Sequence, residues 1–240
     1  MRKVLTLILV AVTVLLMVSP ALADPPDKDN IKLRTFVHYP KPGKPAPTPG
    51  TCDVSSSDPA TYGLTGWRLP GTFTYRVNYG TIPGTVKDPQ AAIYKSFATW
   101  DATTGAVEFA EGAPSSARGY KRDGQNVVVW GSVPSGAIAV TYTWYNSVTR
   151  QAVEVDTVMG ARLPWAYTDP EGINPDAKCG DLYAYDVQDI LTHEVGHWMG
   201  LSDLYNSGDQ DLTMYGYGEK GELKKDTLGN GDLLGTDALY

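Results

Sequence analysis

Residues 193–203 read His-Glu-Val-Gly-His-Trp-Met-Gly-Leu-Ser-Asp, and this stretch is the most informative part of the sequence. His193 and His197 are four residues apart, so on a helix their imidazoles project from one face and can bind a single Zn²⁺. Glu194 lies beside them, where its carboxylate can accept a proton from a water that the metal activates. The spacing therefore predicts a zinc-dependent peptidase.

Residues downstream of the two histidines can complete the coordination of the metal. Gly200 allows a sharp turn after the helix, and Asp203 can then return as the third ligand, because carboxylate oxygen and imidazole nitrogen bind Zn²⁺ at nearly the same distance. His38 is the only histidine outside the motif, so a site of three histidines requires the N-terminal segment to fold back. Two alternatives stay open: Asp203 as a cap of the loop after the helix, and Glu219 or Glu222 as the third ligand.

The run H-E-x-x-H-x-x-G-x-x-D, followed by Met214, resembles the metzincin signature, which has a third histidine where this chain has Asp203. The aspartate variant is similar to the snapalysin type of small secreted bacterial peptidase. Four further segments, in their order around the zinc motif, resemble secreted prokaryotic matrixin-like proteins and extend the likeness over residues 67–240. These segments are residues 73–78, 97–100, 137–141 and 228–235, with Leu239-Tyr240 at the end.

The resemblance implies an α+β zincin domain of the metzincin type. In such a domain a twisted, mostly parallel sheet with an antiparallel edge strand packs on two long helices, and a short C-terminal helix follows. Met214 would form a hydrophobic floor beneath the zinc rather than bind it. The resemblance further implies that the edge strand, with Ala137 and Ala139, binds an extended substrate, while Tyr215 and Tyr217 line the pocket on the leaving-group side.

Three protein ligands leave one coordination position for water, which is the arrangement of a catalytic zinc site. Zinc lowers the pKa of such a water to about 7, so Glu194 can take its proton and later deliver it to the leaving amine. We therefore expect a secreted zinc endopeptidase whose partners are protein or peptide substrates. The alternatives are a non-catalytic zinc-containing binding protein, which has no need of Glu194, and a maturation protease for one exported partner.

The first 23 residues have the features of a secretory signal. Arg2 and Lys3 precede an apolar core over residues 4–18, and small residues at 21–23 form a cleavage site. The apolar core is shorter than a membrane span, so we expect an extracellular protein with no membrane anchor after cleavage. Removing the signal changes the formal net charge from −7 to −9, because Arg2 and Lys3 are its only charged residues. This acidic charge argues against nucleic acid as a partner.

Residues 24–50 are polar and proline-rich, which predicts an extended linker, a short pro-segment, or both, with little burial. Residues 51–240 are expected to form one domain with a sizeable core, and the protein to be a monomer. Hydrophobic periodicity and capping residues predict its elements. Strands are expected over residues 72–79, 107–110, 126–130, 137–145 and 152–158, and helices over 89–102, after Asp186 and around 232–240.

Cys52 and Cys179 are the only cysteines, and export favours a disulfide between them. The alternative, suggested by the resemblance to matrixins, is that the Cys52 thiolate binds the zinc as part of a pro-segment. The same resemblance implies structural Ca²⁺, for which Asp123, Asp209 and Asp211 lie in suitable loops. Solvated loop charge is the alternative for these three carboxylates.

Overall fold

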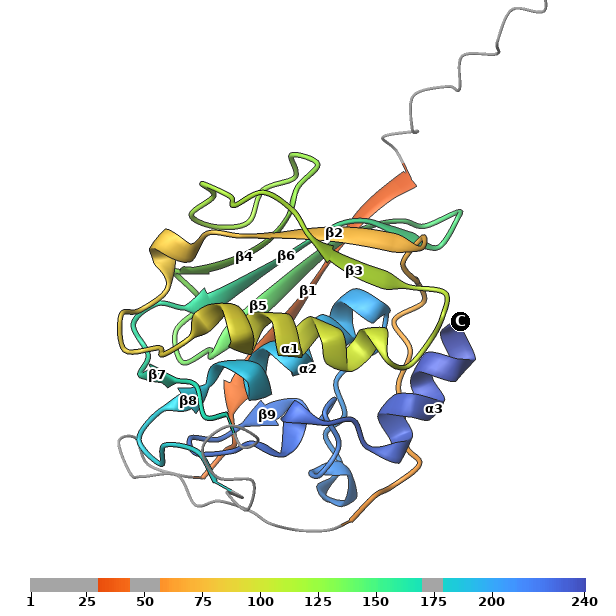
Figure 1. The fold of residues 1–240 in the computed structure, drawn as a ribbon. Helices are drawn as coiled ribbons and strands as arrows, with labels where there is room; N and C mark the ends of the chain where they lie inside the picture. The colour runs from red at the N-terminus through yellow and green to blue at the C-terminus, as the bar shows by residue number, and fades with distance from the viewer. Residues whose placement is uncertain (1–29, 44–56, 170–178) are drawn as a thin grey trace, which may run out of the picture.

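A computed structural model of the protein describes residues 30–43, 57–169 and 179–240, and its central feature is a seven-stranded sheet (Figure 1). Its strands are β1 (Ile31–Pro40), β2 (Thr72–Val77), β3 (Glu108–Glu111), β4 (Asn126–Gly131), β5 (Ala139–Asn146), β6 (Gln151–Gly160) and β9 (Tyr217–Gly218). Two further strands, β7 (Trp165–Ala166) and β8 (Tyr185–Asp186), lie outside this sheet. The helices are α1 (Pro89–Asp101), α2 (Val187–Met199) and α3 (Asn230–Leu239).

The strand order in the large sheet is β3-β2-β4-β6-β5-β1-β9, and β7 pairs with β8 in a separate two-stranded sheet. Strands β3, β2, β4 and β6 are parallel to one another, whereas β5 runs antiparallel to both β6 and β1. Strand β9 is parallel to β1. The predicted α+β class, with a mostly parallel mixed sheet and three helices, is confirmed.

The two longer helices form where their caps were expected. Asp88 accepts a hydrogen bond from the backbone N–H of Ala91 at the start of α1. Asp186 accepts from the backbone N–H groups of Gln188 and Asp189 at the start of α2, which satisfies donors that have no partner within the helix. Gly200 ends α2 in the left-handed region at φ 107°, as its position in the sequence predicts.

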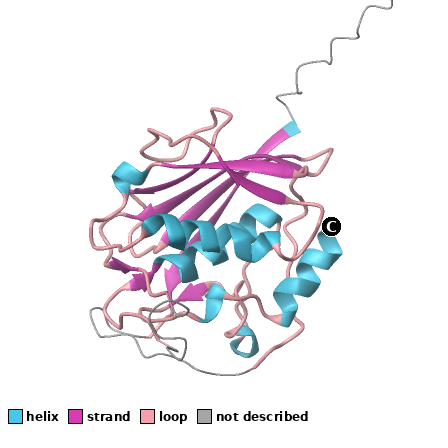
Figure 2. Cartoon of the chain, in the orientation of Figure 1, coloured by secondary structure: helices cyan, strands magenta, loops and turns pink. Residues whose placement is uncertain are grey.

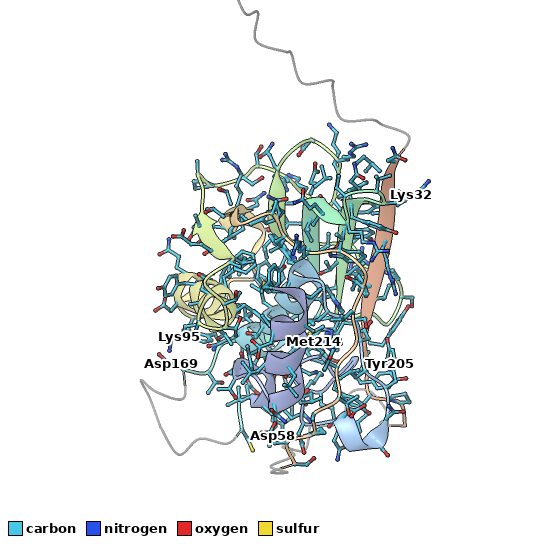
Figure 3. All side chains as sticks on the ribbon, turned by 90° about the vertical axis from the view of Figure 1, so that its right-hand side faces the viewer. Lys32, Asp58, Lys95, Asp169, Tyr205 and Met214 are labelled. Carbon is cyan, nitrogen blue, oxygen red and sulfur yellow. The ribbon has the colours of Figure 1, made fainter. Side chains whose placement is uncertain are left out.

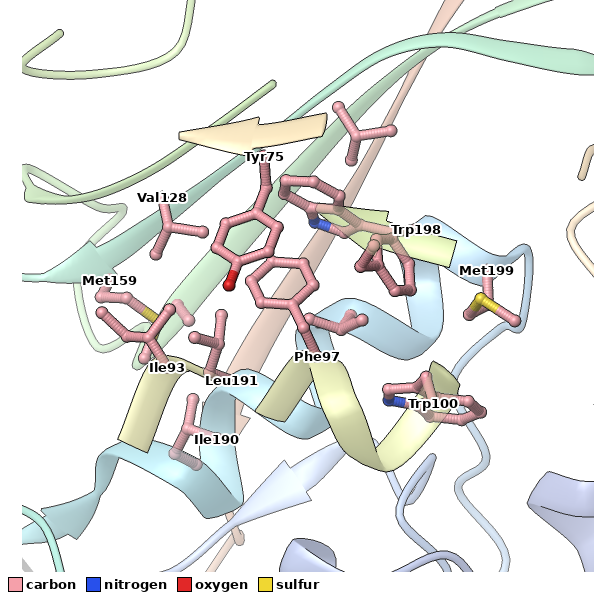
Figure 4. Close-up of a cluster of buried hydrophobic side chains, with 14 of the residues drawn as sticks. Tyr75, Ile93, Phe97, Trp100, Val128, Met159, Ile190, Leu191, Trp198 and Met199 are labelled. Carbon is pink, nitrogen blue, oxygen red and sulfur yellow. The ribbon is translucent and has the colours of Figure 1, made fainter. Parts of the chain in front are cut away.

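Helices α1 and α2 lie side by side across one face of the sheet (Figure 2). Their apolar faces meet the side chains of the sheet in one cluster of aromatic and aliphatic residues (Figure 4). Within it, the ring of Phe97 on α1 stacks on Tyr75 of β2 at 3.7 Å and meets Trp198 of α2 edge-on at 5.3 Å. Strand β2, expected over residues 72–79, is half-buried, because alternate side chains at Phe73, Tyr75 and Val77 are buried. It ends at Val77, and Tyr79 begins a short 3-10 helix.

Over residues 31–40, the prediction that the proline-rich N-terminal segment is a linker with little burial is wrong. These residues form β1, a full strand of the sheet whose Phe36 and His38 side chains are buried. The prolines are concentrated after the strand, and β1 itself contains only Pro40, at its last position. The segment therefore retains the backbone N–H groups that a β-ladder requires.

Strand β5 runs antiparallel to its neighbours, as expected, but the prediction that it lies at the edge of the sheet is wrong. Strand β1 pairs with it from Ile31 opposite Asn146 to His38 opposite Ala139. The edge that would bind an extended peptide is therefore occupied by the chain's own N-terminal segment. The predicted signal sequence lies outside the described residues, and within those residues no helix has the length and apolar character of a membrane span.

Candidate metal centre

Helix α2 carries the two motif histidines and the glutamate between them into the interior of the protein. His193, Glu194 and His197 are each at most 1% exposed. The helix is held in place by its apolar face and by Trp100, whose indole N–H donates to the backbone oxygen of Thr192 at 2.9 Å. The positions of these side chains are therefore set by the packing of α2 against α1 and the sheet.

The two imidazole rings are oriented by backbone carbonyl groups. Nδ1 of His193 lies 2.7 Å from the carbonyl oxygen of Thr213, and Nδ1 of His197 lies 2.9 Å from that of Leu201. A carbonyl partner at Nδ1 is the usual outer support of a metal-binding histidine, because it leaves Nε2 unprotonated and facing the metal. Nε2 is thus the atom that each ring can offer to a cation.

The turn at Gly200 brings Asp203 back to these rings. Oδ1 of Asp203 lies 3.2 Å from Nε2 of His193 and 3.5 Å from Nε2 of His197. The turn requires glycine for two reasons: its φ is positive, and an added Cβ would collide with the backbone oxygen of Trp67. The sequence prediction that Asp203 returns to the histidines agrees with this geometry.

The donor set of this cluster fits a divalent metal. Within the described residues, Nε2 of His193 and Oδ1 of Asp203 are buried without a hydrogen-bond partner, which is costly unless another ligand satisfies them. Two imidazole nitrogens and one carboxylate oxygen form a ligand set that suits Zn²⁺. The alternative ligands Glu219 and Glu222 are not part of the group, and Glu222 instead pairs with Lys224 at 2.9 Å.

Burial and the neighbouring charges act in opposite directions on these ligands. Burial lowers the pKa of His193 to about 4. For Asp203, burial raises the pKa, but the two histidines outweigh it and hold the pKa well below its usual range. The pKa of the Tyr205 hydroxyl is raised by burial and by the neighbouring Asp203 carboxylate. Asp203 is thus present as a carboxylate, and His193 as a neutral imidazole, the forms that bind metal.

The side chain of Glu194, on α2, also makes a hydrogen bond to a residue of the sheet. The hydroxyl of Thr141, on β5, donates to Oε2 of Glu194 at 2.6 Å. Burial raises the pKa of Glu194 to about 7, which is suitable for a group that takes up and releases a proton near neutral pH. The sequence gives no signal that pairs Thr141 with Glu194, because the two residues are 53 positions apart in the chain.

Met214 lies beneath α2, as expected from its position in the motif. A Cβ at Gly196 would overlap its sulfur, so the close approach depends on the glycine. The turn is fixed by Asp232 of α3, whose carboxylate accepts from the backbone N–H groups of Thr213 and Met214 at 2.9 and 3.1 Å. Met214 is buried, whereas Tyr205 is exposed; both residues are labelled in Figure 3.

The residues expected to bind substrate flank the same site. Ala139 begins β5, and Ala137 precedes it at the rim of a hollow of about 380 Å³. Tyr217 lies in β9, and its ring centroid is 5.6 Å from that of Tyr215. The described structure therefore places the predicted pairs on opposite sides of β1, which runs between β5 and β9.

His38 reaches the centre because the N-terminal segment folds back onto it as β1. Its Nδ1 lies 3.3 Å from Oε1 of Glu194, and its ring centroid is 4.0 Å from that of His193. His38, His193 and Glu194 form the second of the two groups in the described residues that could hold a metal. On its other side, Nε2 of His38 lies 3.5 Å from Nζ of Lys225.

The residues predicted to bind Ca²⁺ are not part of the candidate metal centre. Asp123, Asp209 and Asp211 belong to neither of the candidate metal groups among the described residues. Asp123 and Asp209 are engaged locally, with the backbone of Gln125 and the side chain of Asn206. Cys179 is disulfide-bonded, and Cys52, the only other cysteine of the sequence, lies outside the described residues.

Comparison of the chain with protein-family models and with curated proteins finds no match. Similarity to known proteins therefore establishes no family for this chain, and a proposal about its function depends on the site itself.

Proposed function

We propose that this protein is a secreted zinc endopeptidase with a metzincin-like domain. The observation that carries the proposal is the convergence of His193, His197 and Asp203 on one point, with Glu194 on the same helix. A purely structural zinc site has no use for an uncoordinated carboxylate between its histidines, whereas hydrolysis requires a general base at that place.

Each residue of the cluster has a role in this chemistry. Nε2 of His193, Nε2 of His197 and a carboxylate oxygen of Asp203 would hold the Zn²⁺. A bound zinc supplies Lewis acidity, which acidifies water and polarises a carbonyl group. Glu194 accepts the proton of the attacking water and donates it to the departing amine, and Thr141 orients its carboxylate through the 2.6 Å hydrogen bond.

The arrangement of the elements supports the metzincin-like assignment. The motif helix α2 ends at a glycine, the chain turns back to a carboxylate ligand, and Met214 then packs under the helix. The sheet carries one antiparallel strand, β5, beside the site, and α3 follows at the C-terminal end. These features occur in the order that the resemblance implies.

The substrate that best fits the site is an extended stretch of polypeptide. Strand β5 passes directly beside Glu194. Its outer edge already holds one extended segment, β1, by backbone pairing, and an extended substrate could pair with the same edge in place of β1. Such pairing gives affinity without strict sequence requirements, which suits cleavage of unfolded or loop segments of proteins. The predicted signal sequence would bring the enzyme to extracellular substrates.

The test is made on purified residues 24–240 beside the Glu194→Gln variant. We expect both proteins to bind one zinc. Peptidase activity on casein, slow in a chain that retains β1, should be abolished by a chelator, restored by zinc and absent from Glu194→Gln. Activity that survives in Glu194→Gln would contradict the proposed mechanism. An inactive chain that binds no zinc would contradict the proposed function as a whole.

A further inference from the structure

Strand β1 occupies the outer edge of β5, where an extended substrate would pair. Eight of its residues pair antiparallel with β5, and its last two, Tyr39 and Pro40, pair parallel with β9. Further hydrogen bonds join its backbone to both sides, from Ile138 to the oxygen of His38 at 2.7 Å and from Lys41 to the oxygen of Gly218 at 3.2 Å. The N-terminal segment thus binds as an added strand, in the way that peptides bind to a sheet edge.

Two side chains of β1 close the candidate metal centre. The ring of Phe36 stacks on that of His197, with centroids 4.0 Å apart and planes 12° apart. Two residues later and on the same face of the strand, His38 covers His193 and approaches Glu194. Because the three motif side chains are at most 1% exposed, a substrate cannot reach them while β1 is in place.

The rest of the domain does not depend on β1 for its core. In the main hydrophobic cluster of the described residues, Phe36 is the only member that β1 contributes, and the other members lie between Trp67 and Met214. Residues 32–35 of the strand are exposed, and Figure 3 shows Lys32 projecting from the surface. Without β1, the strands from β3 to β5 would still form a five-stranded sheet with β5 at its edge.

We propose that β1 is a displaceable internal ligand that occupies the peptide-binding edge of β5 and keeps the secreted chain latent. All of β1 precedes Cys52, the only cysteine that can pair with the disulfide-bonded Cys179. A single cut between residues 44 and 51 would therefore leave β1 attached only by non-covalent contacts. Its departure would expose the edge of β5 and the metal centre together, and an extended segment of another protein could then take its place. This inference rests on the proposed function, since latency concerns that activity.

The experiment uses the full secreted chain, folded and loaded with zinc, in which residues 45–49 are replaced by the recognition sequence of a site-specific protease. The chain is studied before the cut and after the cut followed by gel filtration. Two quantities are measured: the rate at which a chromogenic chelator removes the zinc, and casein hydrolysis. The first reports access to the metal whether or not the protein is an enzyme.

We expect the cut chain to lose the N-terminal peptide, to release zinc at least tenfold faster and to hydrolyse casein at least 100-fold faster than the intact chain. Faster zinc release without hydrolysis would support the role of β1 and contradict the endopeptidase proposal. Equal hydrolysis before and after the cut would overturn the inference and leave the proposed function intact. Unchanged zinc release after loss of the peptide would also overturn it.

Synthetic peptides of residues 30–42 test whether the closure depends on the contacts described. The wild-type peptide should restore slow zinc release and inhibit hydrolysis when added to the cut chain. A peptide with Phe36→Ala and His38→Ala should be at least tenfold weaker, whereas Lys32→Ala, at an exposed position, should act like the wild type. If the cut peptide stays bound even in a chain that carries Phe36→Ala and His38→Ala, β1 is a permanent strand and the inference fails.

Discussion

The hydroxyl of Thr141 donates a 2.6 Å hydrogen bond to Oε2 of Glu194 and thereby joins β5 to the motif helix. Its oxygen also lies 2.7 Å from that of Thr157 on β6, which in turn accepts from the indole N–H of Trp198 at 2.9 Å. The candidate general base is therefore the end of a buried polar chain that begins on its own helix and passes through two strands. Such a chain restricts the carboxylate to one orientation.

Replacement of Thr141 by valine should separate orientation of the base from metal binding. The substitution keeps the shape of the side chain but removes the hydroxyl, and one hydrogen bond to a charged group is equivalent to about a tenfold effect. We expect kcat of the cut chain to fall about tenfold while its zinc affinity is unchanged. Steady-state kinetics and a zinc competition titration measure the two quantities.

The chain offers a matched control two residues along the same strand. Thr143 is also fully buried, but within the described residues its hydroxyl has no hydrogen-bond partner. Thr143→Val should therefore leave kcat unchanged and should not lower the free energy of unfolding. Equal losses of kcat in the two variants would show that Thr141 acts only through packing.

Asp203 should be essential for metal affinity if it is a ligand rather than a loop cap. Loss of an outer-shell partner of a metal site costs about 10–100-fold in affinity, so loss of a direct ligand should cost at least about 100-fold. We expect this weakening for Asp203→Ala in a competition titration with a chromogenic chelator. Asp123→Ala, which removes an exposed carboxylate outside the cluster, should bind zinc like the wild type.

Much of this fold could be predicted because its signals are local. The caps Asp88 and Asp186 accept hydrogen bonds from N–H groups within three residues of them. Gly200 is favoured at the end of α2 because the φ angle there is positive. The spacing of His193 and His197 likewise follows from the helix repeat alone. Elements determined by contacts within one turn of the chain were therefore predicted to within about two residues, the usual uncertainty of helix ends.

The composition of the N-terminal segment hides its strand. Prolines dominate residues 40–49, and they make the whole segment resemble a linker. Residues 31–39 nevertheless contain the β-branched, aromatic and alternating side chains of a strand, with Ile31, Leu33 and Val37 on one face. The sequence could not indicate that the opposite face, with Phe36 and His38, is the one that becomes buried. That choice depends on where β5 and α2 lie.

Gly196 and Met214 provide a test of the floor under the metal site. Alanine is favoured over glycine in a helix by up to about 1 kcal/mol, so Gly196→Ala would be stabilising on an exposed helix. Here the new Cβ would meet the sulfur of Met214 and a ring carbon of Trp100 at 2.9 Å. Overpacking costs about 1–3 kcal/mol, so we expect a net loss in the free energy of unfolding, measured with urea.

A second substitution identifies the neighbour responsible. In a Met214→Ala background the same Gly196→Ala change should cost less, because the sulfur is gone and only Trp100 remains close. A penalty that does not change in that background would assign the conflict to Trp100 alone.

Asp232 should stabilise the methionine turn more than any exposed acidic residue of its helix does. Its carboxylate accepts from three backbone N–H groups, those of Thr213, Met214 and Gly229. Alanine would leave these donors without a partner, which should lower the free energy of unfolding by about 3 kcal/mol. Asp237→Ala, on the exposed side of the same helix, should change it by less than about 0.5 kcal/mol in the same urea titrations.

Asp156 should make the protein less stable as the pH rises toward neutrality. Burial between β4 and β5 raises its pKa from 3.8 to about 7, although it accepts from the backbone N–H groups of Lys121 and Val127. Between these two pH values the native state keeps a proton that the unfolded chain has released. The free energy of unfolding therefore falls with increasing pH, by at most about 1.4 kcal/mol per pH unit for one proton.

Urea unfolding from pH 4.5 to 7.5 measures this effect. The free energy of unfolding of Asp156→Asn should decline less than that of the wild type, because the amide does not titrate. That of Asp237→Asn, the control, should decline like the wild type. Parallel curves for Asp156→Asn and the wild type would mean that this carboxyl group is already ionised in the folded protein at low pH.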